Sequence, residues 1–233
     1  MFEGMDNSVE TSECQEETFY KHAAKYWSNI PATVDGMLGG FGFISHTDIQ
    51  GSSKFLQQLF KMKDAPGRGR ALDCGAGIGR VTKHLLVPLF DQVDLVEQNP
   101  AFLEQAREYV GPCRKLGELY GCGLQDFVPE EGRYDVIWTQ WVLGHLTDDH
   151  LIQFFKACIG GLRSGGVVVV KENVTSSGRV EVDAEDSSVT RPPALLLELL
   201  GRAGLRCLRE QRQTGFPAGL YPVKMYALRA AAS

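Results

Sequence analysis

A glycine-rich run between a strand and a helix limits the possible folds of this chain more than any other feature of its sequence. The run reads Asp73-Cys-Gly-Ala-Gly-Ile-Gly-Arg80 and separates the short apolar stretch 70–74 from a helical pattern over 79–90. Glycine lets the backbone approach a ligand closely, and a helix N-terminus favours a carboxylate or a phosphate. Glu97 ends the next predicted strand, where a carboxylate accepts hydrogen bonds from ribose hydroxyls. The run therefore predicts a site for a nucleotide-like ligand.

The glycine spacing distinguishes two classes of such ligands. Dinucleotide sites use the pattern GxGxxG, whereas Gly75, Gly77 and Gly79 form the GxGxG pattern of S-adenosylmethionine enzymes, in which no pyrophosphate has to be bound. A nicotinamide site and a simple tight turn are the alternatives. Arg80 either binds the methionine carboxylate of such a cofactor through its guanidinium fork or lies on the helix surface. The segment 123–126, Gly-Leu-Gln-Asp, either contacts the adenine or forms a plain turn.

Strand and helix patterns alternate from residue 70 onward, which indicates an α/β fold with a mainly parallel sheet and helices on both faces. The predicted strands cover residues 70–74, 93–97, 119–122, 134–141, 167–171, 206–211 and 223–228, and the predicted helices cover 79–90, 100–110, 148–162 and 192–203. No helix separates the last two strands, so we expect them to form an antiparallel hairpin at one edge.

The chain before residue 67 has a different pattern. Residues 1–16 are acidic and polar without an apolar period, which is typical of a disordered tail. Two predicted helices, over 18–29 and 48–62, flank an apolar segment at 30–45 that contains glycine and proline. Apolar loops of this kind usually pack over something, as a lid or a wall. We therefore predict a tail at 1–16, a helical lid extension at 17–66 and a catalytic domain at 67–233.

Composition argues against several kinds of partner. The chain has 24 basic and 29 acidic residues, a net charge of −5, whereas non-specific binding to nucleic acid or an anionic membrane needs a basic surplus. Its longest apolar runs, 167–170 and 194–197, are far shorter than the ~20 residues of a membrane span. Six cysteines show no zinc-ligand spacing, so we expect reduced thiols and no metal.

Four stretches of the chain resemble one enzyme family. They are residues 26–40, with Tyr-Trp, Ile-Pro and Val-Asp-Gly-Met-Leu-Gly-Gly; residues 72–80; residues 134–148, Tyr-Asp-Val-Ile-Trp-Thr-Gln-Trp-Val-Leu-Gly-His-Leu-Thr-Asp; and residues 186–189, Asp-Ser-Ser-Val. They are similar to the protein α-N-terminal methyltransferases, which methylate the free α-amine of proteins that begin Xaa-Pro-Lys once the initiator methionine is removed. The likeness covers residues 19–228. Its glycine motif is widespread, but the Gly-Met-Leu-Gly-Gly and Trp-Xaa-Gln-Trp blocks are specific to this family.

The resemblance implies a seven-stranded Rossmann-like class I methyltransferase sheet with S-adenosyl-L-methionine as cofactor. The implied cofactor contacts are Gly75, Arg80, Glu97, Leu124, Gln125 and Gln140. The implied substrate channel is formed by Leu38, Gly39, Ile44, Trp141, Asn173, Asp183, Asp186, Ser188 and Tyr221. Three features depart from the family: Glu97 stands where Asp is more frequent, 175–182 is one residue longer, and Pro192-Pro193 opens a helix that elsewhere begins with acidic residues.

His145 and Asp186 match the catalytic pair of the family, and we add Asn173, whose amide can hold a substrate carbonyl. Only a neutral amine attacks a methyl group, and an α-amine has a pKa of about 7.7–8. Asp183 and Asp186 would attract a cationic N-terminus but also raise its pKa. His145 is a suitable proton acceptor, and Asp186 can hold the ammonium and share the proton. A structural histidine and a solvated acidic loop are the alternatives.

Strand alternation places Trp138 and Gln140 on one face and Trp141 on the other, and we expect Trp141 to line the pocket. The segment 30–44 is expected to form an apolar slot for a proline ring, which has no amide hydrogen.

We predict a protein N-terminal methyltransferase; a small-molecule amine methyltransferase and a non-catalytic cofactor-binding interaction domain are the alternatives. The expected partners are N-terminal tails that begin Xaa-Pro-Lys, not nucleic acid or membrane. The expected location is nucleus and cytoplasm, of which the nuclear part follows from the resemblance alone.

Overall fold

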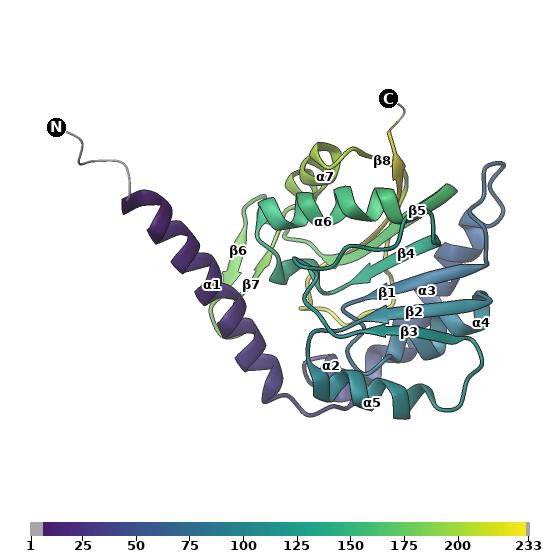
Figure 1. Ribbon diagram of the computed structural model, residues 1–233, viewed down its shortest axis with the longest axis horizontal. Coiled ribbons are helices and arrows are strands. Elements are labelled where there is room, and N and C mark those ends of the chain that lie inside the picture. Colours follow the sequence, from purple (N-terminus) through teal and green to yellow (C-terminus); the bar gives the residue numbers. More distant parts are fainter. Residues whose placement is uncertain (1–6, 232–233) are drawn as a thin grey trace.

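The computed structural model describes residues 7–231, with side chains from residue 15 onward, and its centre is one sheet of seven strands (Figure 1). The strand order is β3-β2-β1-β4-β5-β9-β8, and every pair is parallel except those that β9 makes with β5 and β8. The strands are β1 (Arg70–Cys74), β2 (Gln92–Val96), β3 (Leu116–Tyr120), β4 (Tyr134–Gln140), β5 (Leu162–Asn173), β8 (Leu205–Arg212) and β9 (Val223–Ala230). The predicted sheet and its antiparallel hairpin at one edge are confirmed.

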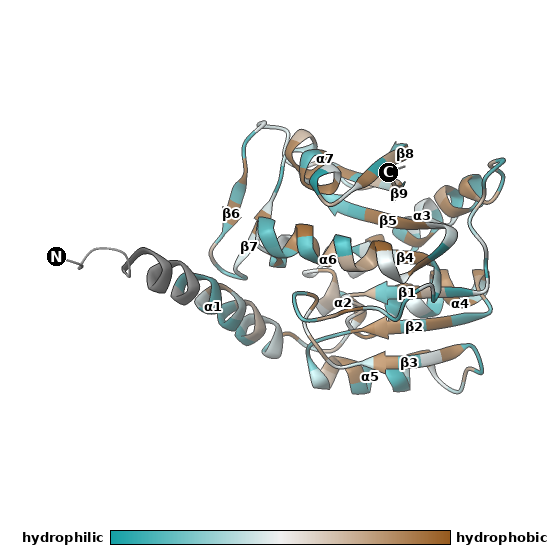
Figure 2. Ribbon diagram, turned by 45° about the horizontal axis from the view of Figure 1, so that its top comes forward, coloured by the Kyte–Doolittle hydropathy of each residue, from teal (hydrophilic) through white to brown (hydrophobic). Residues whose placement is uncertain are grey.

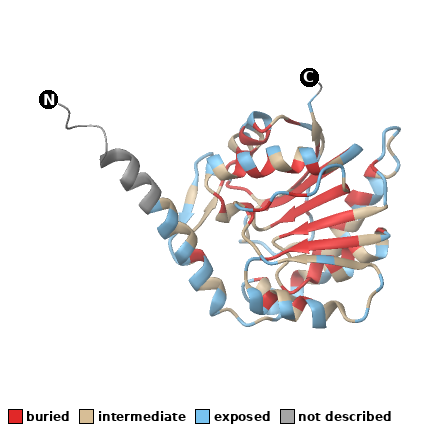
Figure 3. Ribbon diagram, viewed as in Figure 1, coloured by how far each residue is buried: buried red, intermediate tan, exposed pale blue. Residues whose placement is uncertain are grey.

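The central strands are the most buried part of the molecule (Figure 3). All seven residues of β4 are buried, and so are Val167–Val170 in β5. Strands covered on both faces need apolar side chains on both sides, and the apolar colouring of these strands in Figure 2 reflects this. β3 has no fully buried residue and begins three residues before the stretch 119–122 that we expected, because an edge strand shows only a weak apolar pattern.

Helices cover both faces of the sheet. They are α1 (Asn7–Ser28), α2 (Val34–Met37), α3 (Ser45–Leu59), α4 (Val87–Leu89), α5 (Pro100–Val110), α6 (Asp148–Gly161) and α7 (Pro193–Arg202), with a π-helical turn at Thr82–Leu86 and 3-10 turns at Gly42–Ile44 and Leu143–His145. On one face, α6 and α7 pack Phe155 and Leu199 into a core that includes Val168. On the other face, α3 and the π-helical turn pack Phe55 and Leu86 into a core that includes Val169.

Helix α3 is part of this second core, although its residues lie in the predicted lid extension. Phe55, Leu56 and Leu59 are at most 1 % exposed and pack with Met225 of β9. The division into a lid at 17–66 and a domain at 67–233 stays a prediction, and the structure adds that α3 carries buried core residues.

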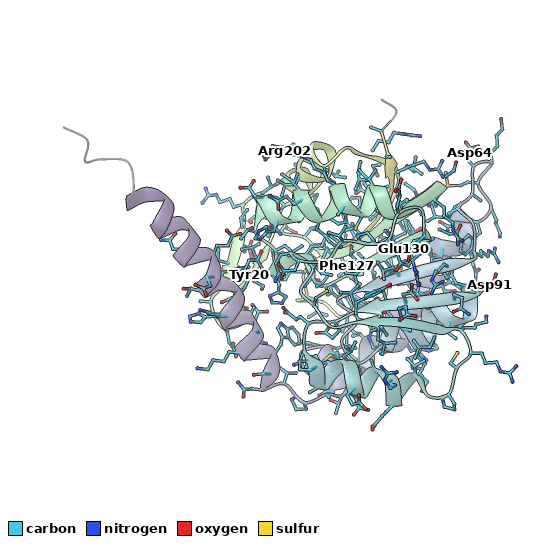
Figure 4. All side chains as sticks on the ribbon, in the orientation of Figure 1. Tyr20, Asp64, Asp91, Phe127, Glu130 and Arg202 are labelled. Carbon is cyan, nitrogen blue, oxygen red and sulfur yellow. The ribbon has the colours of Figure 1, made fainter. Side chains whose placement is uncertain are left out.

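Helix α1 is longer than expected and extends away from the body of the molecule (Figure 1). It begins at Asn7, so residues 7–16 are helical and not part of a tail; residues 1–6 lie outside the described residues. Within α1, Glu16 contacts the start of α6: its Oε1 lies 2.8 Å from His150 Nδ1 and accepts from Thr147 Oγ1 at 3.1 Å. Tyr20 Oη lies 2.7 Å from the same His150 nitrogen, where α1 meets the start of α6 (Figure 4).

A small hairpin that the sequence analysis did not predict lies between β5 and α7. Its strands are β6 (Glu181–Asp183) and β7 (Ser188–Thr190), which pair antiparallel outside the main sheet. Ser187, in its turn, has a φ of 53°. The hairpin defines the conformation of the segment after β5, which the sequence did not predict.

Candidate functional site

Two adjoining pockets lie at the carboxyl ends of the parallel strands. The first is open to solvent and is lined by the turn after β1, by Glu97 after β2, by 122–125 after β3 and by the end of β4. All six residues predicted to contact the cofactor line it: Gly75, Arg80, Glu97, Leu124, Gln125 and Gln140. Helix α1 closes one side of this pocket with Tyr20, Ala23 and Trp27.

The turn after β1 needs glycine for two separate reasons. Gly75 has a φ of +69°, a conformation that costs other L-residues energy. A Cβ at Gly75 would also lie 2.4 Å from Val142 Cγ2, well inside contact distance. Hydrogen bonds to β2 fix the backbone of the turn, because the amides of Gly75 and Ala76 both donate to Val96 O, at 2.9 and 3.0 Å. The turn thus has a backbone surface that a ligand can approach.

Glu97 is held by backbone amides at the rim of the first pocket. Its Oε2 accepts from the Gly77 amide at 2.9 Å and its Oε1 from the Asn99 amide at 2.8 Å. Each carboxylate oxygen has a second lone pair, so both can still accept from ribose hydroxyls. Burial raises the pKa of Glu97, and these amide bonds oppose that shift.

Arg80 lines the first pocket and also reaches behind it. Its Nη1 donates to Asp48 Oδ2 at 2.8 Å, and Asp48 accepts from Gln140 Nε2 at 2.9 and 3.0 Å. Gln140 Oε1 accepts from the Trp138 indole at 3.1 Å, which confirms that Trp138 and Gln140 share a face. Asp48, at the start of the helix predicted over 48–62, is therefore a partner of two pocket residues.

The second pocket, of about 1090 Å³, adjoins the first and shares four side chains with it: Trp27, Met37, Trp141 and His145. Seven of the residues that the resemblance placed in the substrate channel line it: Leu38, Ile44, Trp141, Asn173, Asp186, Ser188 and Tyr221. Gly39 and Asp183 do not line it. Gly39 forms a turn with a φ of +57°, and Asp183 caps the hairpin turn by accepting from the Glu185 amide at 2.8 Å.

Trp141 lines both pockets, as expected, but strand alternation is not what places it there. β4 ends at Gln140, and Trp141 has a φ of +53°, so its direction is set by the turn. Its ring lies 5.7 Å from the Arg80 guanidinium. The indole nitrogen is buried and has no hydrogen-bond partner within the described part of the chain.

His145 and Asp186 meet where the two pockets join. His145 Nε2 lies 4.0 Å from Asp186 Oδ2 and accepts from the Trp27 indole at 3.0 Å, while Nδ1 faces Ser187 O at 3.3 Å. This arrangement requires a neutral imidazole with its proton on Nδ1. Burial lowers the pKa of His145, and Asp186 opposes that shift. Asp186 Oδ1 is buried and makes no hydrogen bond to any described residue, so this oxygen is the free acceptor of the pair.

The turn that carries His145 is fixed by two charged residues that the sequence analysis missed. Glu172 Oε1 accepts from the amides of Val142 and Leu143 at 2.8 and 2.9 Å. Arg191 donates to Leu143 O at 2.9 Å and to Leu146 O at 2.6 Å. Both are at most 8 % exposed. Only their charge marked them in the sequence, and β5 and the hairpin had to be placed before either could be assigned to the turn.

Glu172 gives a prediction about stability and pH. Burial raises the pKa of Glu172 to about 7, whereas an unfolded glutamate titrates near 4.3. The folded chain binds this proton more tightly, so the stability contribution of Glu172 rises as pH falls from about 7 to 4.5 and is lowest above pH 7. Glu172→Gln keeps an acceptor oxygen for the two amides. We expect it to raise the free energy of unfolding at pH 8 by roughly 2 kcal/mol.

Chemical denaturation at pH 8 and pH 5 measures this effect. The gain should shrink at pH 5, where the wild-type carboxyl is protonated. Glu198→Gln, the same change at an exposed position of α7, serves as the control and should show no such gain. The lowered pKa of His145 makes its own contribution to the free energy of unfolding fall as pH falls. Wild type and Glu172→Gln share that contribution, so the difference between their free energies of unfolding reports on Glu172 alone. A Glu172→Gln protein less stable than wild type at pH 8 would contradict the argument.

The two pockets together fit a methyl donor and a basic acceptor. The backbone of the glycine turn, the amide-held carboxylate of Glu97 and the guanidinium of Arg80 line one pocket and fit the adenosyl and carboxylate parts of S-adenosylmethionine. A free carboxylate oxygen on Asp186 suits a cationic or proton-releasing group. Holding both ligands in line across the shared wall can supply about 7–11 kcal/mol of rate acceleration.

Comparisons with known proteins agree with this geometry. Residues 15–229 match the family described as AdoMet dependent proline di-methyltransferase. N-terminal Xaa-Pro-Lys N-methyltransferase 1 of Danio rerio is 54 % identical over 91 % of this chain and 96 % of its own length, and the Homo sapiens protein is 49 % identical over 92 % and 96 %. A SAM-dependent methyltransferase structure from Leishmania major superposes with a TM-score of 0.86 at 38 % identity, covering 91 % of this chain and 83 % of that one.

Proposed function

Because the chain belongs to the AdoMet-dependent proline di-methyltransferases and is an N-methyltransferase that uses S-adenosylmethionine, we propose that it methylates the free α-amine of proteins that begin Xaa-Pro-Lys after removal of the initiator methionine. The observation that carries the proposal is the carboxylate of Asp186, whose Oδ1 is buried and unpartnered among the described residues where the two pockets join. Such an oxygen is costly unless a ligand satisfies it, and an α-ammonium group does so.

The mechanism follows from where the charged groups lie. When bound, the cofactor supplies an electrophilic methyl group on a sulfonium. Arg80 and Glu97, which line the first pocket, would hold its two ends. Asp186 Oδ1 holds the ammonium of the incoming peptide and takes its proton, directly or through water, so that the neutral nitrogen attacks. His145, 4.0 Å from Asp186, shares the proton once the Trp27 indole gives up its bond to Nε2.

The second pocket also suits a proline at the second position of the peptide. Leu38 and Ile44, each less than 9 % exposed, come from the segment over the pocket and face it together with the ring of Trp141. A proline ring has a fixed φ and no amide hydrogen, so an apolar wall leaves none of its groups without a partner. Asn173 at the end of β5 lines the same pocket, and its amide can hold a peptide carbonyl.

A methylation assay with labelled S-adenosylmethionine tests the proposal. The substrates are an Xaa-Pro-Lys hexapeptide, its N-acetylated copy, an Xaa-Leu-Lys copy and a set of small amines. Label on the free-amine Xaa-Pro-Lys peptide alone supports the proposal. Label on small amines but not on the peptide would show a small-molecule enzyme, and no label with intact cofactor binding would show a non-catalytic domain. Equal labelling of the proline and leucine peptides would refute the apolar slot.

The proposal extends to location, for which the nuclear part has the family resemblance as its only support. We propose nucleus and cytoplasm, and a fluorescent fusion with cell fractionation tests it. Within residues 7–231, none of the helices is both long enough and apolar enough to cross a membrane.

A further inference from the structure

A buried ionic cluster lies behind the first pocket, and the reaction proposed above does not use it. Lys171 of β5 is 0 % exposed, and its Nζ lies 2.5 Å from Asp48 Oδ1. The same nitrogen donates to Ser52 Oγ at 2.9 Å and Gln213 Oε1 at 2.8 Å. Asp48, also 0 % exposed, receives Arg80 Nη1 on its other oxygen at 2.8 Å. Two cations therefore share one carboxylate.

Because Lys171 shares the carboxylate of Asp48, the positive charge of Arg80 is not fully neutralised. Within the described residues only Nη1 of Arg80 makes a hydrogen bond, so Nε and Nη2 are available on a side chain that lines the pocket. If Asp48 were paired with Arg80 alone, its negative charge would neutralise the positive charge of Arg80. The ion pair between Lys171 and Asp48 offsets the negative charge of Asp48. Asp73 also acts electrically on Arg80, but its Oδ2 accepts from Thr82 Oγ1 at 2.6 Å instead of from Arg80.

The same carboxylate aligns both pocket residues that reach it. Asp48 holds Arg80 through one oxygen and Gln140 through both. A buried charge of this kind is expensive as a means of stability alone, because apolar residues of similar volume usually serve as well. Its position suits the orientation of Arg80 and Gln140. Asp48 lies on α3, in the N-terminal extension, and contacts both of these pocket residues.

We propose that Asp48 and Lys171 are positioning residues for the carboxylate of the cofactor: Asp48 orients Arg80, and Lys171 offsets the charge of Asp48 so that Arg80 stays available to an anion. The proposal rests on the cofactor alone. Its tests contain no peptide, so failure here would leave the proposed peptide substrate untouched, and a failed peptide assay would leave this inference standing.

The first test compares two ligands by calorimetry. S-adenosylhomocysteine carries the amino-acid carboxylate, whereas 5′-methylthioadenosine has the same adenosine and thioether without it. We expect Lys171→Met to weaken S-adenosylhomocysteine binding at least about 10-fold, the size of one lost charge-assisted contact, and to change methylthioadenosine binding less than about threefold. Equal losses for both ligands would show a merely structural role and overturn the proposal. Lys224→Met, which removes an outer lysine paired with Glu210, is the matched control.

A double variant tests the sign of the charge argument. Asp48→Asn combined with Lys171→Met removes one charge of each sign and leaves Arg80 positive without a neutralising partner. We expect it to bind S-adenosylhomocysteine at least about threefold more tightly than Lys171→Met alone. If the residues matter only for packing, the second change should add to the damage, and a double variant weaker than the single one would overturn the proposal.

A measurement on the wild-type protein covers the case in which the variants do not fold. Burial lowers the pKa of Lys171 to about 8, and Asp48 opposes that shift. The charged groups that face it are Asp48 from α3 and Arg80. Its uncharged neighbours are Ser52 of α3, Gln213 after β8 and the ring of Trp141, whose centre lies 5.9 Å away. Deaminated S-adenosylhomocysteine keeps the carboxylate but has no amine. Its affinity should fall between pH 7 and pH 9 while that of methylthioadenosine stays level. Parallel behaviour of the two ligands would overturn the proposal.

Discussion

Replacing Asp186 with asparagine is expected to lower kcat for an Xaa-Pro-Lys peptide by at least about 100-fold, the scale of a lost general base. Asparagine has nearly the shape of aspartate, but it cannot take a proton, and it presents an amide where the peptide amine must lie. Asp186 Oδ1 has no hydrogen-bond partner among the described residues, so the substitution breaks no hydrogen bond at this oxygen. Because Asp186 does not line the first pocket, calorimetry should show S-adenosylhomocysteine affinity unchanged.

Glu185→Gln is the matched control for Asp186→Asn. Glu185 is the adjacent hairpin carboxylate and lines neither pocket, so its loss should leave kcat close to wild type. The pH profile adds a second readout, because raising the pH deprotonates the peptide amine in solution and should restore part of the lost rate. If Asp186→Asn keeps kcat within about tenfold of wild type while His145→Gln abolishes it, the proton acceptor is His145 instead.

Replacing Gly75 with alanine is expected to weaken S-adenosylhomocysteine binding at least about 100-fold, or ~2.8 kcal/mol. The new Cβ would lie 2.4 Å from Val142 Cγ2 and 2.7 Å from its Cβ. Val142 has little freedom to move, since its amide is bonded to Glu172. A left-handed φ adds about 1–2 kcal/mol of strain for alanine. Both effects push the turn after β1 into the space of the ligand.

Gly132→Ala separates the effect of backbone strain from the effect of a steric overlap with Val142. Gly132 has a φ of +59°, close to that of Gly75, but a Cβ there would meet nothing within 4 Å. Both variants should lose some thermal stability, measured by calorimetric unfolding, whereas only Gly75→Ala should lose cofactor binding in a titration. Equal ligand affinity in the two proteins would show that the close approach at Gly75 is not needed.

The parts of the site that the sequence predicted are those set by local structure. The glycines around Gly75, and Glu97 at the end of the next strand, follow from one strand–turn–helix unit and its neighbour in a parallel sheet. Their spacing is therefore visible in the chain itself. Arg80 and residues 124–125 were also proposed from the residues themselves, and the resemblance supplied Gln140; all of these line one pocket.

The parts that were missed depend on residues far apart in the chain. Lys171 contacts the carboxylate of Asp48, 123 residues away, and neither has a local pattern that distinguishes it from a surface charge. Glu172 and Arg191 hold a turn formed by 142–146 only after β5 and the small hairpin are placed. The early part of α1 was missed because residues 7–16 have no apolar period.

The four side chains that belong to both pockets have a consequence for repeated turnover on one amine. A second methyl group can be added without rebinding the peptide only if the spent cofactor leaves while the peptide stays. Trp27, Met37, Trp141 and His145 form the partition between the two chambers. Trp27 also belongs to α1, which closes the cofactor side. If the spent cofactor leaves through an opening of α1, Trp27 moves and peptide binding is weakened. If it leaves past residues 122–125, peptide binding is preserved. The exit route of the cofactor therefore decides between distributive and processive methylation.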